Sequence, residues 1–590
     1  MKRSSLVVAL GLSSLAGAIA IAPQTAEACG GLFCDAGPQP MPVDQSGENI
    51  LFVREGEYIE AHIQVQYVGE AQDFGWVIPL QGVPEFFVGS EPMFQALLTG
   101  TVPTYSVQVQ PDDCSVPNDS GAFPGEDQDA ADTAAGTGAP GGDGGDPGGP
   151  QVVLQQTVGA YEVTVLEGGT AAQVIDWLDE NGYQQDPESE PILQAYLDED
   201  HLFGAVKLTG GADVKEIHPI VLRFRSDEPC IPLRLTRIAA VEDMDVRSFF
   251  LGDSRTVPQN YRHVLVNPVK VDWTTNNLAA NYKSVITQAV DADQANGRAF
   301  VTEYAGSSDV VQQGSIYTES WNSGVFEDIP ATAVIDRLTQ QGLFFCDVDF
   351  GNGCSSTHPL VQPILDQYLP VPAGVDANSF YECVECYADQ LDPEAWDGPA
   401  FAQALQDRVI TPGQHAVDLL RNNGYLSRLY TTISPGEMTE DPMFHENDGL
   451  GDVTNLQSAV QRILCNGDSV YILPDGRQVY LPAGAPWPDF DNEPAWSMPS
   501  DEEVQEVMQS GAPIVLSNNT QVIDDALAAY NDQMGWAGGV AADGGSSDGS
   551  LDGDDAASGC GCRAGTTPGG VLLMLLGLGL GATSRRRRLE

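Results

Sequence analysis

The chain has 590 residues, with 84 acidic against 26 basic side chains and a formal net charge of −58. Such a charge repels nucleic acid and anionic lipid headgroups and favours solubility and divalent cations, so binding to nucleic acid is excluded. Of eleven cysteines, nine lie between Cys29 and Cys465. In an oxidising compartment they predict disulfides, and their odd number leaves one free or paired outside the body.

The N-terminus has the pattern of a secretory signal. A basic start, Lys2-Arg3, precedes the apolar run Leu6–Ala22 and then small residues ending at Ala28. This pattern predicts a signal peptide over 1–28, cut by signal peptidase before Cys29. Glu27 stands where a lipoprotein site needs a small or aliphatic residue, so plain cleavage is favoured over lipidation of Cys29.

Residues 29–110 form the β-rich start of the body. Apolar and polar residues alternate from Ile59 to Tyr67, which predicts a strand with one face in water, and the pattern recurs at 105–109. From 111 to 150 the chain is Asp, Gly, Ala and Pro, which predicts a disordered acidic insertion. Alternation resumes at 161–165, so the insertion interrupts one domain and its flanking strands can pair.

Residues 151–310 mix helices and strands. Thr170 and Gln173 form a capping-box pattern that opens a helix, and Gly182 can end it. A second helix follows around 191–197 and a third at 278–290. Strands are expected at 202–208, 220–224 and 231–238. The order predicts an α+β fold with mixed, largely antiparallel sheets and capped helices.

Residues 311–536 form a helical and mixed part that contains the best candidate for a metal site. Between Cys346 and Cys354, the residues Asp347, Asp349 and Asn352 offer oxygen ligands in a Gly-rich turn, as calcium binding needs. The spacing departs from an EF-hand at three positions. A disulfide-closed turn with solvated acids is therefore the favoured interpretation. Calcium binding is the alternative that can be tested more directly, and no other cofactor is indicated.

Further cysteines can be interpreted in several ways. The pair Cys383 and Cys386 fits a disulfide best, since acidic neighbours disfavour a redox thiolate. As half of a zinc site it would recruit Cys354 and His358, at a spacing that matches no standard finger. Cys29 and Cys34 complete the disulfide candidates.

A faint internal repeat links two helix pairs. Helix patterns ending at Gly182 and near 191–197 recur around Gly342 and 363–369. Either an internal duplication or convergence explains them, because a helix that ends in glycine is ordinary. Beyond it, the sequence predicts helices at about 453–464 and from Ser500 onward, then a flexible acidic stalk at 537–559.

The last residues, 560–590, form a three-part tail. Cys560 and Cys562 begin it, an apolar segment at 569–583 follows, and a basic cluster ends it: Arg585, Arg586, Arg587 and Arg588. As a helix the segment is about 22 Å long, against a hydrocarbon core of ~30 Å, and the arginines would stay in the cytoplasm. The tail resembles the MYXO-CTERM sorting signal of myxobacterial surface proteins. That resemblance implies a sorting protease of the membrane and delivery to the cell surface; an ordinary transmembrane anchor is the alternative.

Stretches of the body carry a second resemblance. They are Ala28-Cys29-Gly30-Gly31, Gln45 to Ile50, Gln64 to Tyr67, Phe74 to Pro79, and Leu426 to Phe444. They resemble an exported bacterial family of unknown function, the DUF2330 type, over roughly residues 29–444. Because the family has no assigned activity, the resemblance implies a recurrent domain and no catalytic residues.

No catalytic motif is present: the sequence has no His-Glu-x-x-His helix, no phosphate loop and, in ordered segments, no Gly-x-Ser-x-Gly elbow. The catalytic residues and the ligand therefore stay unassigned. We expect an exported protein of the cell envelope, a binding or structural module held at the membrane at least transiently. The alternative is a secreted hydrolase, calcium-assisted, with Asp347, Asp349, His358 and His445 converging in a pocket.

Overall fold

The computed structural model describes residues 47–65, 74–112, 149–183, 189–210, 212–226, 228–238, 240–274, 278–347, 353–392 and 395–536. The chain divides into two compact units, 1–541 and 542–590, and every described residue lies in the first. The expected signal peptide, stalk and sorting tail, and residues 113–148 of the insertion, lie outside the described residues. Within the described ranges, no helix has the length and apolar character that a membrane crossing requires.

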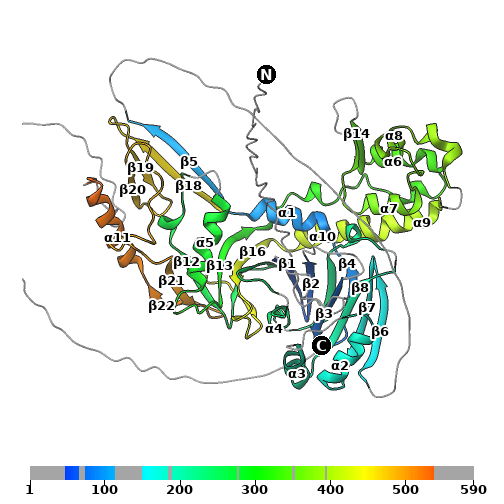
Figure 1. The fold of residues 1–590 in the computed structure, drawn as a ribbon, viewed down its shortest axis with the longest axis horizontal. Coiled ribbons are helices and arrows are strands. Elements are labelled where there is room, and N and C mark those ends of the chain that lie inside the picture. Colours follow the sequence, from blue (N-terminus) through cyan, green and yellow to red (C-terminus); the bar gives the residue numbers. More distant parts are fainter. Residues whose placement is uncertain are drawn as a thin grey trace, which may run out of the picture. The chain divides into compact units, whose positions relative to one another are not determined.

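A ten-stranded sheet is the centre of the fold (Figure 1). Neighbouring strands are parallel in the pairs β1–β10 and β12–β13 and antiparallel in the other pairs of this sheet, so the expected α+β class with mostly antiparallel sheets is confirmed. In spatial order the strands are β22 (Ile514–Asn518), β21 (Asp501–Glu506), β12 (Arg262–Val266), β13 (Ala299–Ser307), β16 (Tyr425–Ile433), β10 (Met244–Gly252), β1 (Gly47–Glu55), β2 (Tyr58–Val65), β9 (Ile220–Arg225) and β4 (Glu85–Val88).

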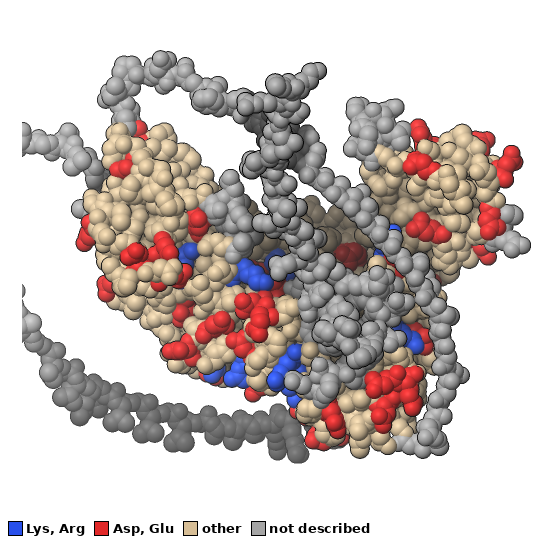
Figure 2. Space-filling model, in the orientation of Figure 1, with Lys and Arg blue, Asp and Glu red and all other residues tan. Residues whose placement is uncertain are grey.

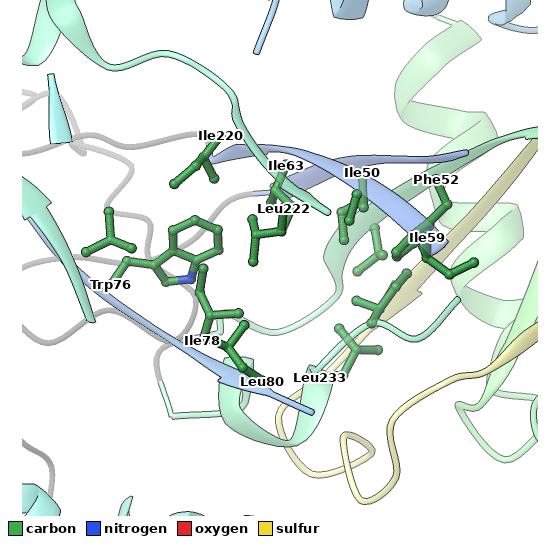
Figure 3. Packing of buried hydrophobic residues seen from close by; sticks show 14 of the residues in the cluster. Ile50, Phe52, Ile59, Ile63, Trp76, Ile78, Leu80, Ile220, Leu222 and Leu233 are labelled. Carbon is green, nitrogen blue, oxygen red and sulfur yellow. The ribbon is translucent and has the colours of Figure 1, made fainter. Parts of the chain in front are cut away.

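The largest apolar core lies between this sheet and a four-stranded sheet (Figure 3). The second sheet has the order β3 (Gly75–Leu80), β8 (Leu202–Leu208), β7 (Tyr161–Glu167) and β6 (Gln151–Val158). Ile50, Ile63 and Leu222 of the large sheet face Trp76 and Ile78 of the small one, all nearly inaccessible to solvent. Each such side chain contributes about 1.5–3 kcal/mol when buried, so this interface holds the two sheets together.

Helices cover the opposite face of the large sheet. Leu51 and Val53 of β1 point to that face and pack with Phe94 and Val417. The covering helices are α1 (Glu91–Thr101), α10 (Thr411–Asn422) and α5 (Leu278–Val290). β1 is therefore buried on both faces, as the continuous apolar run from Ile50 to Val53 indicates.

A helical region has its own core, formed by residues from Phe326 to Ile410. Its elements are α6 (Val334–Gln340), the hairpin β14 (Phe344–Asp347) and β15 (Gly353–Ser356), α7 (Val361–Tyr368), α8 (Ala377–Glu382) and α9 (Gly398–Leu405). A π-helical turn, Gln406–Ile410, connects α9 directly to α10. One continuous helical rod therefore runs from this region onto the large sheet.

A third core lies near the C-terminal end of the described chain. It joins α11 to a second four-stranded sheet, and a short sheet pairs β11 with β17. The elements are β20 (Gln478–Leu481), β19 (Ser469–Ile472), β18 (Leu456–Ile463), β5 (Thr104–Pro111), α11 (Thr520–Gln533), β11 (Arg255–Pro258) and β17 (Phe444–Asn447).

Two predicted helices form as expected in the first half. The capping box between Thr170 and Gln173 opens α2 (Ala171–Glu180), and α3 is Ser189–Asp198. Gly182 has a φ of 84° and Gly342, after α6, a φ of 73°, the left-handed conformation that glycine adopts freely. The first helix of each pair thus ends alike, which leaves the duplication a prediction.

Three local predictions were wrong. Residues 231–238 contain a short helix, α4 (Leu233–Thr236), because Pro232 cannot donate to a ladder and Asp441 accepts from the N–H of Arg234. The expected helix at 453–464 is strand β18, which pairs with β5 and β19. The helix expected from Ser500 is strand β21, and the Ser500 hydroxyl donates to Gln288 instead of capping. In the last two cases, pairing partners distant in sequence outweigh local preference.

The strands that flank the acidic insertion do not pair with each other. β5 pairs with β18, whereas β6 and β7 belong to the sheet of β3 and β8. The chain therefore leaves one sheet before residue 113 and enters another after residue 148. A hairpin was a reasonable expectation because alternation resumed at once, but the partner of β5 lies about 350 residues downstream.

Acidic side chains are spread over the described surface drawn in Figure 2, and Lys and Arg form smaller groups among them. This distribution agrees with the net charge of −58. It leaves no broad basic face in that view on which an anionic polymer could bind.

Candidate metal centre

Strand β2 presents its polar residues to the helix-covered face of the large sheet. Ile59, Ala61 and Ile63 enter the core against the small sheet, so Glu60 and His62 point the other way. The sequence predicted that this face would be in water, and that prediction was wrong. Glu60 is 3% exposed and His62 1%, because α1 and α10 cover the face.

A histidine from α10 completes a compact cluster. Glu60 Oε1 lies 2.7 Å from His62 Nε2 and 2.5 Å from His415 Nε2, so one carboxylate oxygen bridges two imidazoles. The two rings are nearly parallel, with centroids 6.0 Å apart and an interplanar angle of 15°. Among the described residues, these three form the group whose ligand atoms all lie within 4.8 Å of one another.

The helix that carries His415 has an irregular start. The π-helical turn Gln406–Ile410 stands immediately before Thr411-Pro412. Pro412 has no N–H with which to continue the regular ladder, and a π turn absorbs such a break. His415 lies one turn beyond Pro412, and its side chain is 44% exposed, so this member of the cluster is accessible to solvent, whereas Glu60 and His62 are buried.

The electrostatics of the cluster prepare it for a cation. Burial raises the pKa of Glu60, but the hydrogen bonds and charges of His415 and His62 outweigh it and bring the pKa to about 2. Burial lowers the pKa of His62 in spite of its bond to Glu60, and the bond to Glu60 raises the pKa of His415. At neutral pH the carboxylate is therefore ionised and His62 is neutral, which are the states that metal ligands need, whereas a metal ion would have to displace the proton that Glu60 stabilises on His415.

The donor set suits a transition metal better than calcium. Two imidazoles and a carboxylate are ligands of zinc and of non-haem iron, whereas calcium takes oxygen ligands. A tetrahedral ion at about 2.0–2.1 Å from each ligand would set the ligand atoms roughly 3.3 Å apart. The two separations from Glu60 are 2.7 and 2.5 Å, so these side chains would move apart by about 0.6 and 0.8 Å to reach that spacing. His62 Nδ1, the ring nitrogen that is not bonded to Glu60, is buried without a hydrogen-bond partner in the described structure.

The disulfides predicted in the second half are present. Cys346 pairs with Cys354 and Cys383 with Cys386. With these thiols oxidised, the zinc interpretation of Cys354, Cys383 and Cys386 loses its ligands. Of the cysteines within the described ranges, Cys230 is free. Cys29 and Cys34 lie outside the described residues, as do Ala28 and the tail residues Cys560, Cys562 and Arg585 to Arg588.

The predicted calcium ligands are not brought into the cluster. Asp349 and Asn352 lie outside the described residues, and of Asp347 only the backbone, in β14, is described. His358 is buried beside Trp321 and accepts the N–H of Leu360 through Nδ1. His445 lies in β17, and the ligand cluster found in the described chain contains neither histidine.

Cys230 lies at a second candidate site, an apolar pocket of about 80 Å³ between the two sheets of the main core. Tyr196 and Asp441 line it too and are hydrogen-bonded to each other. Burial strongly raises the pKa of the Cys230 thiol, and the charge of Asp441 raises it further. The thiol therefore stays protonated at neutral pH and is no nucleophile.

Fold and site together define a mixed α+β protein with a buried cluster of two histidines and one glutamate. The chain belongs to the DUF2330 family, described as uncharacterized and conserved in bacteria, whose model matches residues 23–323. That range contains Glu60 and His62 and ends before His415. No curated protein matches the sequence. A crystal structure of a mutated baculovirus P35 after caspase cleavage is similar at 10% identity and a TM-score of 0.20, over 37% of this chain and 69% of that one, which is too little to carry an argument.

Proposed function

We propose that this protein is an exported binding module of the cell envelope whose folded body binds a transition-metal ion of the zinc type. The observation that carries the proposal is the convergence of Glu60, His62 and His415 from a strand and a distant helix. A neutral imidazole, an ionised carboxylate and an open side toward solvent are together the features of a metal-binding site.

The proposed location rests on the sequence. The basic and apolar start of the chain supports export and cleavage by signal peptidase, and the apolar tail with its arginines supports attachment to the membrane, cell surface or outer membrane. The MYXO-CTERM resemblance would add a sorting protease and a myxobacterial source. Two disulfides in the described chain are in keeping with an oxidising exterior. Fractionation of the host cell tests the location: intact chain in the cytosol with reduced thiols would contradict it.

Metal binding is tested by thermal unfolding of the full chain after removal of metals with EDTA. Zinc at 100 times its Kd should stabilise the folded state by about 2.7 kcal/mol, and calcium should not act at this site. In His415→Gln, the zinc effect should be lost, because one of three ligands is gone. His201→Gln is the matched control, since His201 is a partly buried histidine outside the cluster.

Two outcomes would contradict the proposal. An equal zinc effect in all three proteins would mean that the ion binds to acidic groups elsewhere, and no effect in the unaltered protein would mean that the cluster is only structural. Calcium has its own test: a midpoint that depends on calcium and is lost in Asp347→Asn would favour the loop between Cys346 and Cys354.

The second candidate is a secreted hydrolase. The observation that favours it is that three protein ligands and a solvent-open side match catalytic zinc sites, where the fourth position holds water. Zinc-loaded protein should then hydrolyse activated esters or phosphoesters at a rate that falls in Glu60→Gln. The calcium-assisted form would instead depend on Asp347 and Asp349. Metal binding without turnover would leave the binding module as the function.

A further inference from the structure

A further cavity, distinct from the pocket at Cys230, lies at the part of the large sheet formed by β12 and β13. It has a volume of about 150 Å³ and is lined by the start of β5, the end of β12 and the segment after it, the interior of β13, one residue of α5, and the chain at the start of β18. Cavities of about 150 Å³ admit a molecule the size of benzene, several times the share of one water. Three aromatic residues and one carboxylate, Glu303, set its chemistry.

Glu303 owes its position to a β-bulge. The register of β13 against β16 shifts between Thr302 and Tyr304, so Glu303 is the extra residue without a partner in the ladder. Bulges re-aim side chains and are common beside functional sites. The Glu303 side chain is 2% exposed, and its Oε2 lies 2.6 Å from Arg428 Nε. Arg428 offsets the cost of burying this carboxylate, and the bulge places it in the wall of the cavity.

Three aromatic rings form the other walls. The ring of Tyr105 lies 5.2 Å from that of Trp273 at 69°, and 5.7 Å from that of Tyr282 at 59°. Because these rings are steeply inclined to one another, some turn their faces and others their edges toward the cavity. Burial raises the pKa of Tyr282, as do the negative charge of Glu303 and a hydrogen bond to it, so the phenol keeps its proton.

The charges favour a cation over other occupants. The face of an aromatic ring attracts positive charge, and Trp does so most strongly. Arg428 balances part of the charge of Glu303, but it does not line the cavity; it lies over Phe249 and donates to Thr101. An anion would meet the carboxylate of Glu303 here, which disfavours it. The net charge of −58 also concentrates cations at the surface.

We propose that this cavity binds a small organic cation of the alkylammonium class, held by the rings of Tyr105, Trp273 and Tyr282 with Glu303 as its counter-charge. The aromatic cage is independent of the metal cluster. Strands β2 and β16 are three strand spacings apart in the sheet, so roughly 14 Å separates His62 from Arg428, beside Glu303.

The test compares choline with its neutral isostere 3,3-dimethylbutan-1-ol, which has the same shape without the charge. The full chain is titrated with each by calorimetry at 150 mM salt with EDTA present. Choline should bind at least about tenfold more tightly than the alcohol, the factor that a desolvated cation–π contact supplies. Tyr105→Leu, which removes one wall without changing the charge, should weaken choline binding about tenfold.

Tyr58→Leu is the matched control because Tyr58 is a partly buried tyrosine of another strand, away from the cavity; it should bind choline as the unaltered protein does. Glu303→Gln should also weaken choline binding and leave the alcohol unaffected, in a variant whose melting shows that it folds. Equal affinity for choline and the alcohol would overturn the proposal in favour of a simple apolar cavity. Absence of choline binding, or an unchanged affinity in Tyr105→Leu, would overturn it as well.

Discussion

Replacing Arg477 with methionine should destabilise the C-terminal part of the body strongly. The Arg477 side chain is 8% exposed and donates to three carboxylates, of Asp475, Glu502 and Asp524, at 2.7, 2.7 and 2.8 Å. These acids belong to the turn before β20, to β21 and to α11. The Arg477 guanidinium therefore links the turn before β20, β21 and α11 through three ion pairs.

The magnitude follows from what the substitution leaves behind. Methionine keeps the length of the side chain but abandons three acids, and removing one partner of a buried ion pair costs 3–5 kcal/mol. The three carboxylates are 21–29% exposed, so solvent relieves part of this cost. We expect a loss of about 3 kcal/mol, or two powers of ten in the unfolding equilibrium.

Urea unfolding followed by tryptophan fluorescence measures the loss, since Trp487 and Trp496 lie in the same core as α11. The control is Arg462→Met: that arginine is 49% exposed and binds Asp112 alone, so the cost should stay below about 1 kcal/mol. Neutralising the three acids together in Arg477→Met should recover most of the stability. A loss under about 1 kcal/mol, or no recovery, would refute the reasoning.

Three further predictions concern single positions. Burial lowers the pKa of His218 to about 4, so as the pH falls the unfolded chain binds the proton before the folded protein does. The free energy of unfolding should therefore fall by about 3 kcal/mol from pH 6.5 to pH 4. In His218→Gln the free energy of unfolding should depend less on pH over that range, and an equal dependence would contradict this. Gly159→Ala should lower the free energy of unfolding by more than the roughly 1–2 kcal/mol that a left-handed backbone costs, because φ is 60° and the new Cβ would also lie 2.1 Å from His218 Nε2. An unchanged urea midpoint would disprove this. In Gly100→Ala, the contact of the Cβ with the Val310 carbonyl oxygen at 2.7 Å should outweigh the helix gain of about 1 kcal/mol, and a more stable variant would be the contrary result.

Local patterns in the sequence predicted local structure well. The capping box at Thr170, the stop at Gly182 and the alternation in β2 concern neighbours within a few residues. The strands β18 and β21 were mistaken for helices because their ladder partners come from elsewhere in the chain. Pairing satisfies the backbone in a way that propensity does not encode.

The sequence could have indicated two of the three residues of the metal cluster. Glu60 and His62, two apart on a predicted strand, had to share one face, and that spacing could have marked them as paired ligands. Their burial could not be foreseen, because it depends on α10. His415 is 355 residues from Glu60, and one histidine among seven gives no signal of its own.

The place of β16 in the large sheet limits how the protein can be divided. β16 lies between β13 and β10, yet it begins a hundred residues after the family match ends at 323. A fragment cut to the family range would leave β10 and β13 with bare, apolar edges, which invite aggregation. The end of the family match is thus no suitable boundary for an expressed fragment, and the gap between β10 and β13 can be filled only after residue 433 has been synthesised.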